Sequence, residues 1–127
     1  MLEMKHVALS MDTRDHAIEF YQNVLGAELK KEFRVPKELV FQIFSINIDT
    51  GLDVLVFEIN GSQFEIFLYD KLKRDCLDHV CIAVEDRFGF IRKCKENGLP
   101  VSIIAKDKKE IVFIKDFVGN LFEVKKY

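Results

Sequence analysis

Alternating apolar and polar positions occur in two similar stretches of the chain. Residues 4–11 read MKHVALSM and residues 77–84 read LDHVCIAV, so each stretch carries a histidine, His6 or His79, at the same place. Side chains alternate between the two faces of a strand, so each stretch predicts a strand with its histidine and small residues on one face. Apolar residues occupy the other face, which suits packing on a core. The two histidines are therefore the first candidates for a functional site.

A segment with helical spacing of its apolar residues follows each of these strands. A capping residue of the Asp or Thr type precedes each segment and a glycine closes it, which is typical of a short helix. Shorter β-rich runs fill the remainder of each half, and Asn60-Gly61 is a strong hairpin signal between two of them. The predicted helices span 14–25 and 87–97, and the further predicted strands span 29–35, 39–48, 52–59, 63–69, 101–105, 111–115 and 121–125.

The two halves also repeat each other in their last strands. Residues 61–66 read GSQFEI and residues 119–124 read GNLFEV, which share the pattern G-x-x-F-E followed by Ile or Val. The chain is therefore predicted to contain two β-α-β-β-β modules, an internal duplication. The first module is the longer one, and its additional residues fall between Lys30 and Gly51.

Composition places limits on the class of protein. With 127 residues, 49% of them apolar and 31% charged, the chain is expected to form one globular domain. A net charge of -2 gives no basic footprint for nucleic acid or an anionic membrane. No signal peptide or spanning segment is seen, so a cytoplasmic protein is expected. Cys76, Cys81 and Cys94 form no C-x-x-C motif, and Cys81 and Cys94 are predicted to be buried thiols.

Each module contributes one histidine and one glutamate to the same side of its sheet. Alternation puts Glu65 and Glu123 on the side away from the helix, where His6 and His79 are also expected. If the two sheets are brought together, two imidazoles and two carboxylates converge, a donor set that suits zinc, nickel, cobalt or iron(II). The third histidine, His16, has no repeated counterpart and is predicted to be structural or exposed.

The order of these motifs resembles the vicinal oxygen chelate superfamily, which includes glyoxalases, bleomycin resistance proteins and extradiol dioxygenases. The resemblance covers essentially the whole chain. It implies an α+β domain over residues 1–127, with module one at 1–70 and module two at 76–127. The curved mixed sheets would form a half-barrel with the helices outside. The resemblance and the exposed sheet edges also imply a homodimer. The matching motifs are KHVAL (5–9), FYQNVLG (20–26), FEI (64–66), LDHVCIAVED (77–86) and GNLFEV (119–124).

In members of this superfamily the metal ligands lie on the first and last strands of each module. Carried over to this chain, that implies a divalent metal site made of His6, Glu65, His79 and Glu123. This ligand set is most similar to that of glyoxalase I, the lactoylglutathione lyase. It implies a lyase or isomerase that acts on a small substrate with vicinal oxygens through an enediolate-type intermediate. Glu123 would be the catalytic base and Glu65 its partner.

Two other classes of function stay open at this point. An iron(II) extradiol-type dioxygenase would use His6, His79 and Glu123, and a drug-sequestering binding module would need no metal. Ser10 and Tyr69 stand where glyoxalase I has an arginine and an asparagine that contact glutathione. Glutathione is therefore not the expected thiol.

Overall fold

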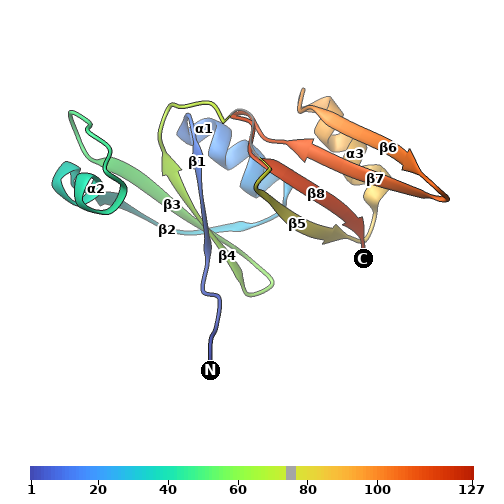
Figure 1. The fold of residues 1–127 in the computed structure, drawn as a ribbon, viewed down its shortest axis with the longest axis horizontal. Helices are drawn as coiled ribbons and strands as arrows, with labels where there is room; N and C mark the ends of the chain where they lie inside the picture. Colours follow the sequence, from blue (N-terminus) through green and yellow to red (C-terminus); the bar gives the residue numbers. More distant parts are fainter. Residues whose placement is uncertain (74–76) are drawn as a thin grey trace. The chain divides into compact units, whose positions relative to one another are not determined.

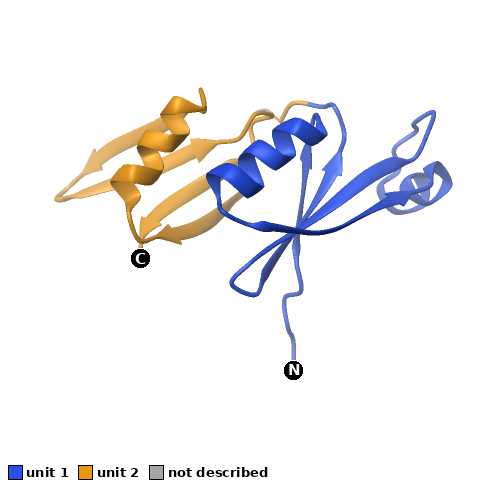
Figure 2. Ribbon diagram, turned by 180° about the vertical axis from the view of Figure 1, so that it is seen from behind, with its two compact units in different colours: residues 1–71 blue, residues 72–127 orange. Residues whose placement is uncertain are grey.

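The structure, a computed structural model, describes residues 1–73 and 77–127. It divides into two compact units, residues 1–71 and residues 72–127 (Figure 2). Each unit holds one four-stranded mixed sheet with a helix packed on it, which confirms the predicted α+β fold with two repeated modules. Cys76 and part of the predicted connection between the modules lie outside the described residues. No helix in the described part of the chain is long and apolar enough to cross a membrane.

The first unit has its strands in the order β1-β4-β3-β2 (Figure 1). β1 pairs with β4 in parallel, whereas the other neighbours are antiparallel. The first and last strands of the unit are therefore adjacent. Its elements are β1 (Val7–Met11), α1 (Arg14–Ala17), the π-helical segment η1 (Ile18–Val24), β2 (Glu28–Val35), α2 (Lys37–Phe44), β3 (Leu52–Ile59) and β4 (Ser62–Leu68).

The second unit repeats this arrangement with the strand order β5-β8-β7-β6 (Figure 1). β5 pairs with β8 in parallel, so again the first strand lies beside the last. This equivalence confirms the duplication that the sequence predicted. The elements are β5 (His79–Val84), α3 (Arg87–Glu96), β6 (Val101–Lys106), β7 (Lys109–Lys115) and β8 (Leu121–Lys126).

The helical segment α1–η1 defines the core side of the first sheet. Thr13 caps its start by accepting a hydrogen bond from the backbone N–H of His16 at 3.1 Å. Tyr21 is fully buried and stacks on Phe57 of β3, with ring centroids 5.3 Å apart, and its ring also lies against Phe64 of β4. Because side chains alternate along β4, residue 65 points to the opposite side of the sheet. The face of the sheet that carries Glu65 is therefore not covered by α1 or η1.

The prediction of a strand over 39–48 is wrong, because residues 37–44 form the helix α2. Pro36 starts this helix, since its carbonyl accepts the N–H groups of Leu39 and Val40 at 3.0 and 3.1 Å. Val40 is completely buried against β2 and β3, whereas most of the other apolar residues of α2 stay exposed. Packing of one helical stripe thus overrides the high β-propensity of the sequence. The additional length of the first module is this helix and the loop after it.

The helix α3 carries a glycine whose replacement tests the N-terminal cap. Asp86 accepts a hydrogen bond from the backbone N–H of Gly89 at 2.9 Å. A Cβ atom at residue 89 would lie 2.2 Å from Oδ2 of Asp86, so the cap would have to move.

Gly89→Ala is therefore expected to bring no stabilisation, although alanine in place of a helical glycine usually stabilises by about 1 kcal/mol. Loss of the cap costs a similar amount and cancels the gain. In an Asp86→Ala background, where no cap remains to be displaced, the same Gly89→Ala change should stabilise by about 1 kcal/mol. Chemical denaturation of the four proteins measures both effects. A full gain from Gly89→Ala alone would show that the cap does not oppose the added methyl group.

Candidate functional site

The histidine and the glutamate of each unit are brought together by the same strand register. In the first unit Ala8 of β1 lies opposite Glu65 of β4, and in the second unit Cys81 of β5 lies opposite Glu123 of β8. In both cases the histidine stands two residues before that partner, on the same face of the sheet. The duplicated sequence thus builds the same donor pair twice.

In the first unit, Nδ1 of His6 lies 3.2 Å from Oε2 of Glu65. Both side chains are partly open to solvent, at 40% exposure for the imidazole and 22% for the carboxylate. The neighbours of Glu65 along β4, Phe64 and Ile66, are buried on the helix side. The pair therefore lies on the face that the sequence predicted for it, accessible to a ligand.

In the second unit, Nε2 of His79 lies 3.8 Å from Oε1 of Glu123. Nδ1 of the same ring is 2.9 Å from the carbonyl oxygen of Leu77, and a carbonyl only accepts, so Nδ1 carries the proton. Nε2 is the other ring nitrogen, and it faces the carboxylate. The ring is also held by an edge contact with Phe113, with centroids 5.3 Å apart. A backbone carbonyl behind an imidazole is the usual support of a metal-binding histidine.

The thiol of Cys81 lies beside this second pair. Partial desolvation of the sulfur atom, followed by the charge of the Glu123 carboxylate, raises the pKa of Cys81. In the absence of a metal ion, the raised pKa favours the protonated thiol over the thiolate. The residue is exposed, so the prediction that Cys81 is a buried thiol is wrong, because Cys81 shares the open face of β5 with His79. Cys94 is buried as predicted, and burial raises its pKa to about 11.

The donor chemistry of each pair fits a divalent cation, although each pair alone is only half of a usual ligand set. Imidazole nitrogen and carboxylate oxygen are ligands for zinc, nickel, cobalt, iron and manganese. Structural and catalytic sites of this kind have at least three protein ligands. Within residues 1–73 and 77–127, no three His, Cys, Asp or Glu side chains are grouped to hold a metal ion. The assignment of all four ligands to one ion therefore stays a prediction.

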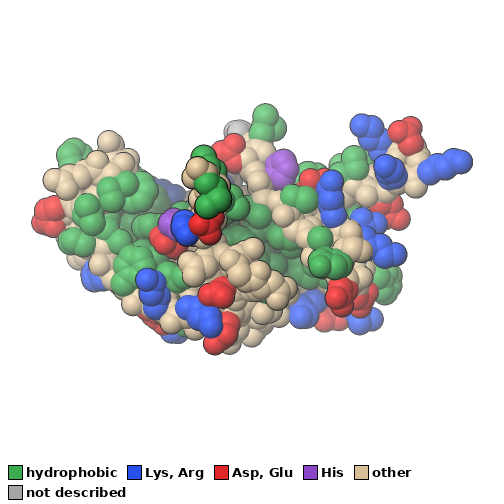
Figure 3. Space-filling model, turned by 90° about the horizontal axis from the view of Figure 1, so that it is seen from below, with side chains coloured by type: hydrophobic (Ala, Val, Ile, Leu, Met, Phe, Trp, Pro, Cys, Tyr) green, Lys and Arg blue, Asp and Glu red, His purple; other side chains and the backbone are tan. Residues whose placement is uncertain are grey.

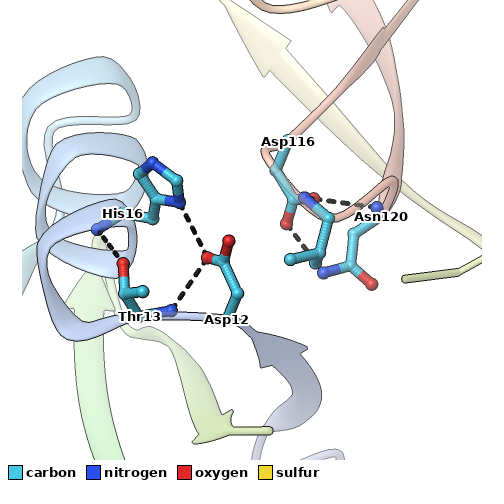
Figure 4. Close-up of polar contacts among 6 residues, drawn as sticks. Asp12, Thr13, His16, Asp116 and Asn120 are labelled. Atoms are coloured by element: carbon cyan, nitrogen blue, oxygen red, sulfur yellow. Dashed lines mark hydrogen bonds and ion pairs between the residues drawn. The ribbon is translucent and has the colours of Figure 1, made fainter. Parts of the chain in front are cut away.

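The third histidine has a structural partner, as the sequence predicted. Nδ1 of His16 lies 2.8 Å from Oδ1 of Asp12, which also accepts the backbone N–H of Thr13 (Figure 4). This arrangement closes the turn between β1 and α1. His16 thus serves as a natural control for the two histidines of the pairs.

A buried polar turn before β8 was not anticipated from the sequence. Asp116 is 2% exposed and accepts three hydrogen bonds: from the backbone N–H of Val118 at 3.0 Å, from that of Asn120 at 2.8 Å and from Nδ2 of Asn120 at 2.7 Å (Figure 4). The turn joins β7 to β8 and so sets the start of the strand that carries Glu123. Asp, Asn and Gly together in residues 116–120 were the available signal.

Comparisons with known proteins agree with this fold. The family model described as glyoxalase/bleomycin resistance protein/dioxygenase superfamily matches residues 3–124. The mitochondrial methylmalonyl-CoA epimerase of Homo sapiens is 28% identical over 127 residues, which cover 95% of this chain and 72% of that protein. The epimerase of Bos taurus gives the same identity and coverage.

Two solved structures illustrate the similarity of fold. A glyoxalase family protein from Enterococcus faecalis superposes with a TM-score of 0.71 at 22% identity, over 96% of this chain and 95% of that one. A mutant of the fosfomycin resistance protein FosX from Listeria monocytogenes, complexed with Mn(II) and 1S,2S-dihydroxypropylphosphonic acid, gives a TM-score of 0.75 at 17% identity, over 98% and 90%. The expected superfamily and fold are therefore confirmed, whereas glyoxalase I is not singled out.

Proposed function

Because the chain belongs to the glyoxalase/bleomycin resistance protein/dioxygenase superfamily, we propose that it is a divalent-metal-dependent isomerase or lyase of the glyoxalase I type. It would move a proton at a carbon beside a carbonyl group, in a small substrate with two neighbouring oxygens. The observation that carries this proposal is the histidine–glutamate pair, repeated in the same register in both units.

The proposed ligands are the four side chains of the two pairs, His6, Glu65, His79 and Glu123, acting on one ion. A bound nickel, cobalt, zinc, iron or manganese ion would stabilise the negative charge that develops on the substrate oxygens. The Leu77 carbonyl supports this assignment in the second unit, because it orients His79 with Nε2 toward Glu123.

Glu123 is the proposed base. Its carboxylate is 25% exposed and lies beside His79, so a substrate can reach it without unfolding of the strand. It would take the proton from the substrate carbon and return it to the same or the adjacent carbon, with Glu65 as the partner that exchanges roles with it. General acid–base groups of this kind are placed within hydrogen-bond reach of the reacting proton.

Elemental analysis of protein purified without added metal or chelator tests the shared site. We expect about one divalent ion per chain, and its loss in both His6→Ala and His79→Ala, because each pair supplies half of the ligands. His16→Ala is the matched control and should retain the ion. Two ions per chain, each lost in only one of the variants, would instead mean two separate sites. No ion, and no thermal shift when ions are added back, would contradict a metalloenzyme.

The substrate is tested in two arms that share the same chemistry. Hemithioacetals of methylglyoxal with several thiols test the glyoxalase-type reaction, and proton exchange at carbon 2 of malonyl-type thioesters in D2O tests an epimerase. The second arm is included because the curated relatives are epimerases. Activity in either assay supports the proposal and shows whether the reaction is of the glyoxalase type or of the epimerase type. Oxygen uptake with catechols would instead indicate a dioxygenase, and tight binding of small aromatic molecules without metal would indicate a binding module.

A further inference from the structure

An aromatic corner borders the His6–Glu65 pair in the first unit. Glu65 and Phe67 are two residues apart on β4 and share a face, so about 7 Å separates them along the strand. The ring of Phe67 meets the ring of Phe44, from α2, edge to face with centroids 5.5 Å apart. A group held at Glu65 is therefore within reach of these two rings.

The helix that supplies Phe44 is fixed on the sheet. Val40, one turn before Phe44, is buried together with Val35 of β2 and Val54 of β3. Val54 lies directly opposite Phe67 in the strand register, so the packed core runs up to the Phe67 ring. The corner formed by Phe44 and Phe67 is thus held in place by packing of α2 on the sheet.

The Phe44–Phe67 corner also exposes apolar surface to solvent. Phe44 is 43% exposed in spite of its contact with Phe67, and Figure 3 shows hydrophobic side chains gathered over α2. An exposed apolar patch next to polar groups commonly marks the place where a ligand is bound. Other apolar side chains of α2 are open as well, namely Leu39, Phe41 and Ile43.

We propose that the Phe44–Phe67 corner binds an apolar substituent, aromatic or branched, carried by the substrate next to its two oxygens. This inference rests on the proposed function, because it takes His6 and Glu65 as the groups that hold the oxygen end. The substrate would therefore be larger and more apolar than methylglyoxal itself. α2, the element that lengthens the first module, is then a determinant of specificity.

The test compares two chelating probes on metal-loaded protein. Acetohydroxamate and benzohydroxamate present the same two adjacent oxygens and differ in a methyl or a phenyl group. By calorimetry, benzohydroxamate should bind about 10-fold more tightly, in keeping with an aromatic contact. Phe44→Ala should abolish most of this preference and leave the Kd of acetohydroxamate unchanged, and Phe44→Leu should retain part of it. Phe41→Ala, on the same helix and 51% exposed, is the matched control and should keep the full preference.

Several outcomes would overturn the inference. One is an equal affinity of the wild type for both probes, and another is an equal loss of both in Phe44→Ala. Weaker self-association of Phe44→Ala and Phe41→Ala in sedimentation, with the phenyl preference intact, would assign the patch to a contact between copies of the chain. Neither readout requires turnover. A preference for the phenyl probe in an inactive protein would refute only the proposed reaction. Turnover without this preference would refute only the proposal that the Phe44–Phe67 corner binds an apolar substituent.

Discussion

Replacement of Glu123 by glutamine is expected to lower turnover by about 100- to 10,000-fold, the range typical of a lost general base. Glutamine keeps the shape of the side chain and an oxygen that can bind metal, but it cannot take up a proton at neutral pH. Metal content should fall less than activity, because His79 and the other pair remain. Steady-state kinetics on the substrate found in the screen, with elemental analysis of the same sample, measures the two effects.

Glu96→Gln is the control for the change of charge in the same unit. Glu96 is 69% exposed on α3 and lies 4.0 Å from Arg92, so the substitution should leave turnover unchanged. Glu65→Gln should lower turnover as well, because Glu65 is the proposed partner in the proton transfer. If Glu123→Gln retained both the metal and full turnover, the assignment of the base would be wrong.

Asp116→Ala is expected to destabilise the protein by about 3 kcal/mol or more, the largest stability effect predicted here. The change leaves the buried N–H groups of Val118 and Asn120 without an acceptor, and each such group costs about 1–3 kcal/mol. It also removes the acceptor of the Asn120 side chain. Because this turn sets the start of β8, the variant should also bind metal more weakly. Chemical denaturation gives the free energy of unfolding.

Asp116→Asn separates the hydrogen bonds from the charge. The amide oxygen can still accept both backbone N–H groups, so this variant should lose clearly less stability than Asp116→Ala. Burial raises the pKa of the Asp116 carboxyl above its ordinary value of 3.8, against the opposing effect of its hydrogen bonds. A raised pKa in the folded state means that this group's contribution to stability falls as the pH rises from about 3.8 through the raised value. Asp116→Asn should lack that dependence, and equal losses in both variants would contradict the argument.

The donor pairs could be predicted from the sequence because they depend on short-range periodicity and on duplication. Alternation alone placed His79 and Glu123 on one face, and the repeat identified the equivalent residues in the first half. The hairpin at Asn60-Gly61 was predictable for a similar reason, since both residues have positive φ, at 48° and 81°, as the tightest hairpin turns require. Local rules were sufficient in these places.

The remaining features depend on contacts distant in the chain. The segment around Val40 folds into a helix because Val40 is buried against Val35 and Val54. Composition alone indicated a strand over 39–48. The contact between Phe44 and Phe67 could not be predicted, because it depends on the helix α2. The hydrogen bonds of Asp116 require that residues 116–120 close a buried turn, and a short polar sequence does not reveal burial. Tertiary packing decided each of these cases.

The parallel pairing of first and last strands has a consequence for the order of assembly. Within each unit, the histidine is made at the beginning of the segment and the glutamate near its end, with the helix and the inner strands between them. A nascent chain on the ribosome therefore carries the imidazole long before its carboxylate partner exists. Because contacts between residues far apart in the sequence form slowly, we expect the donor pair to close late. A cation that needs both closed pairs would then bind only after both units are complete and would stabilise the folded chain by mass action.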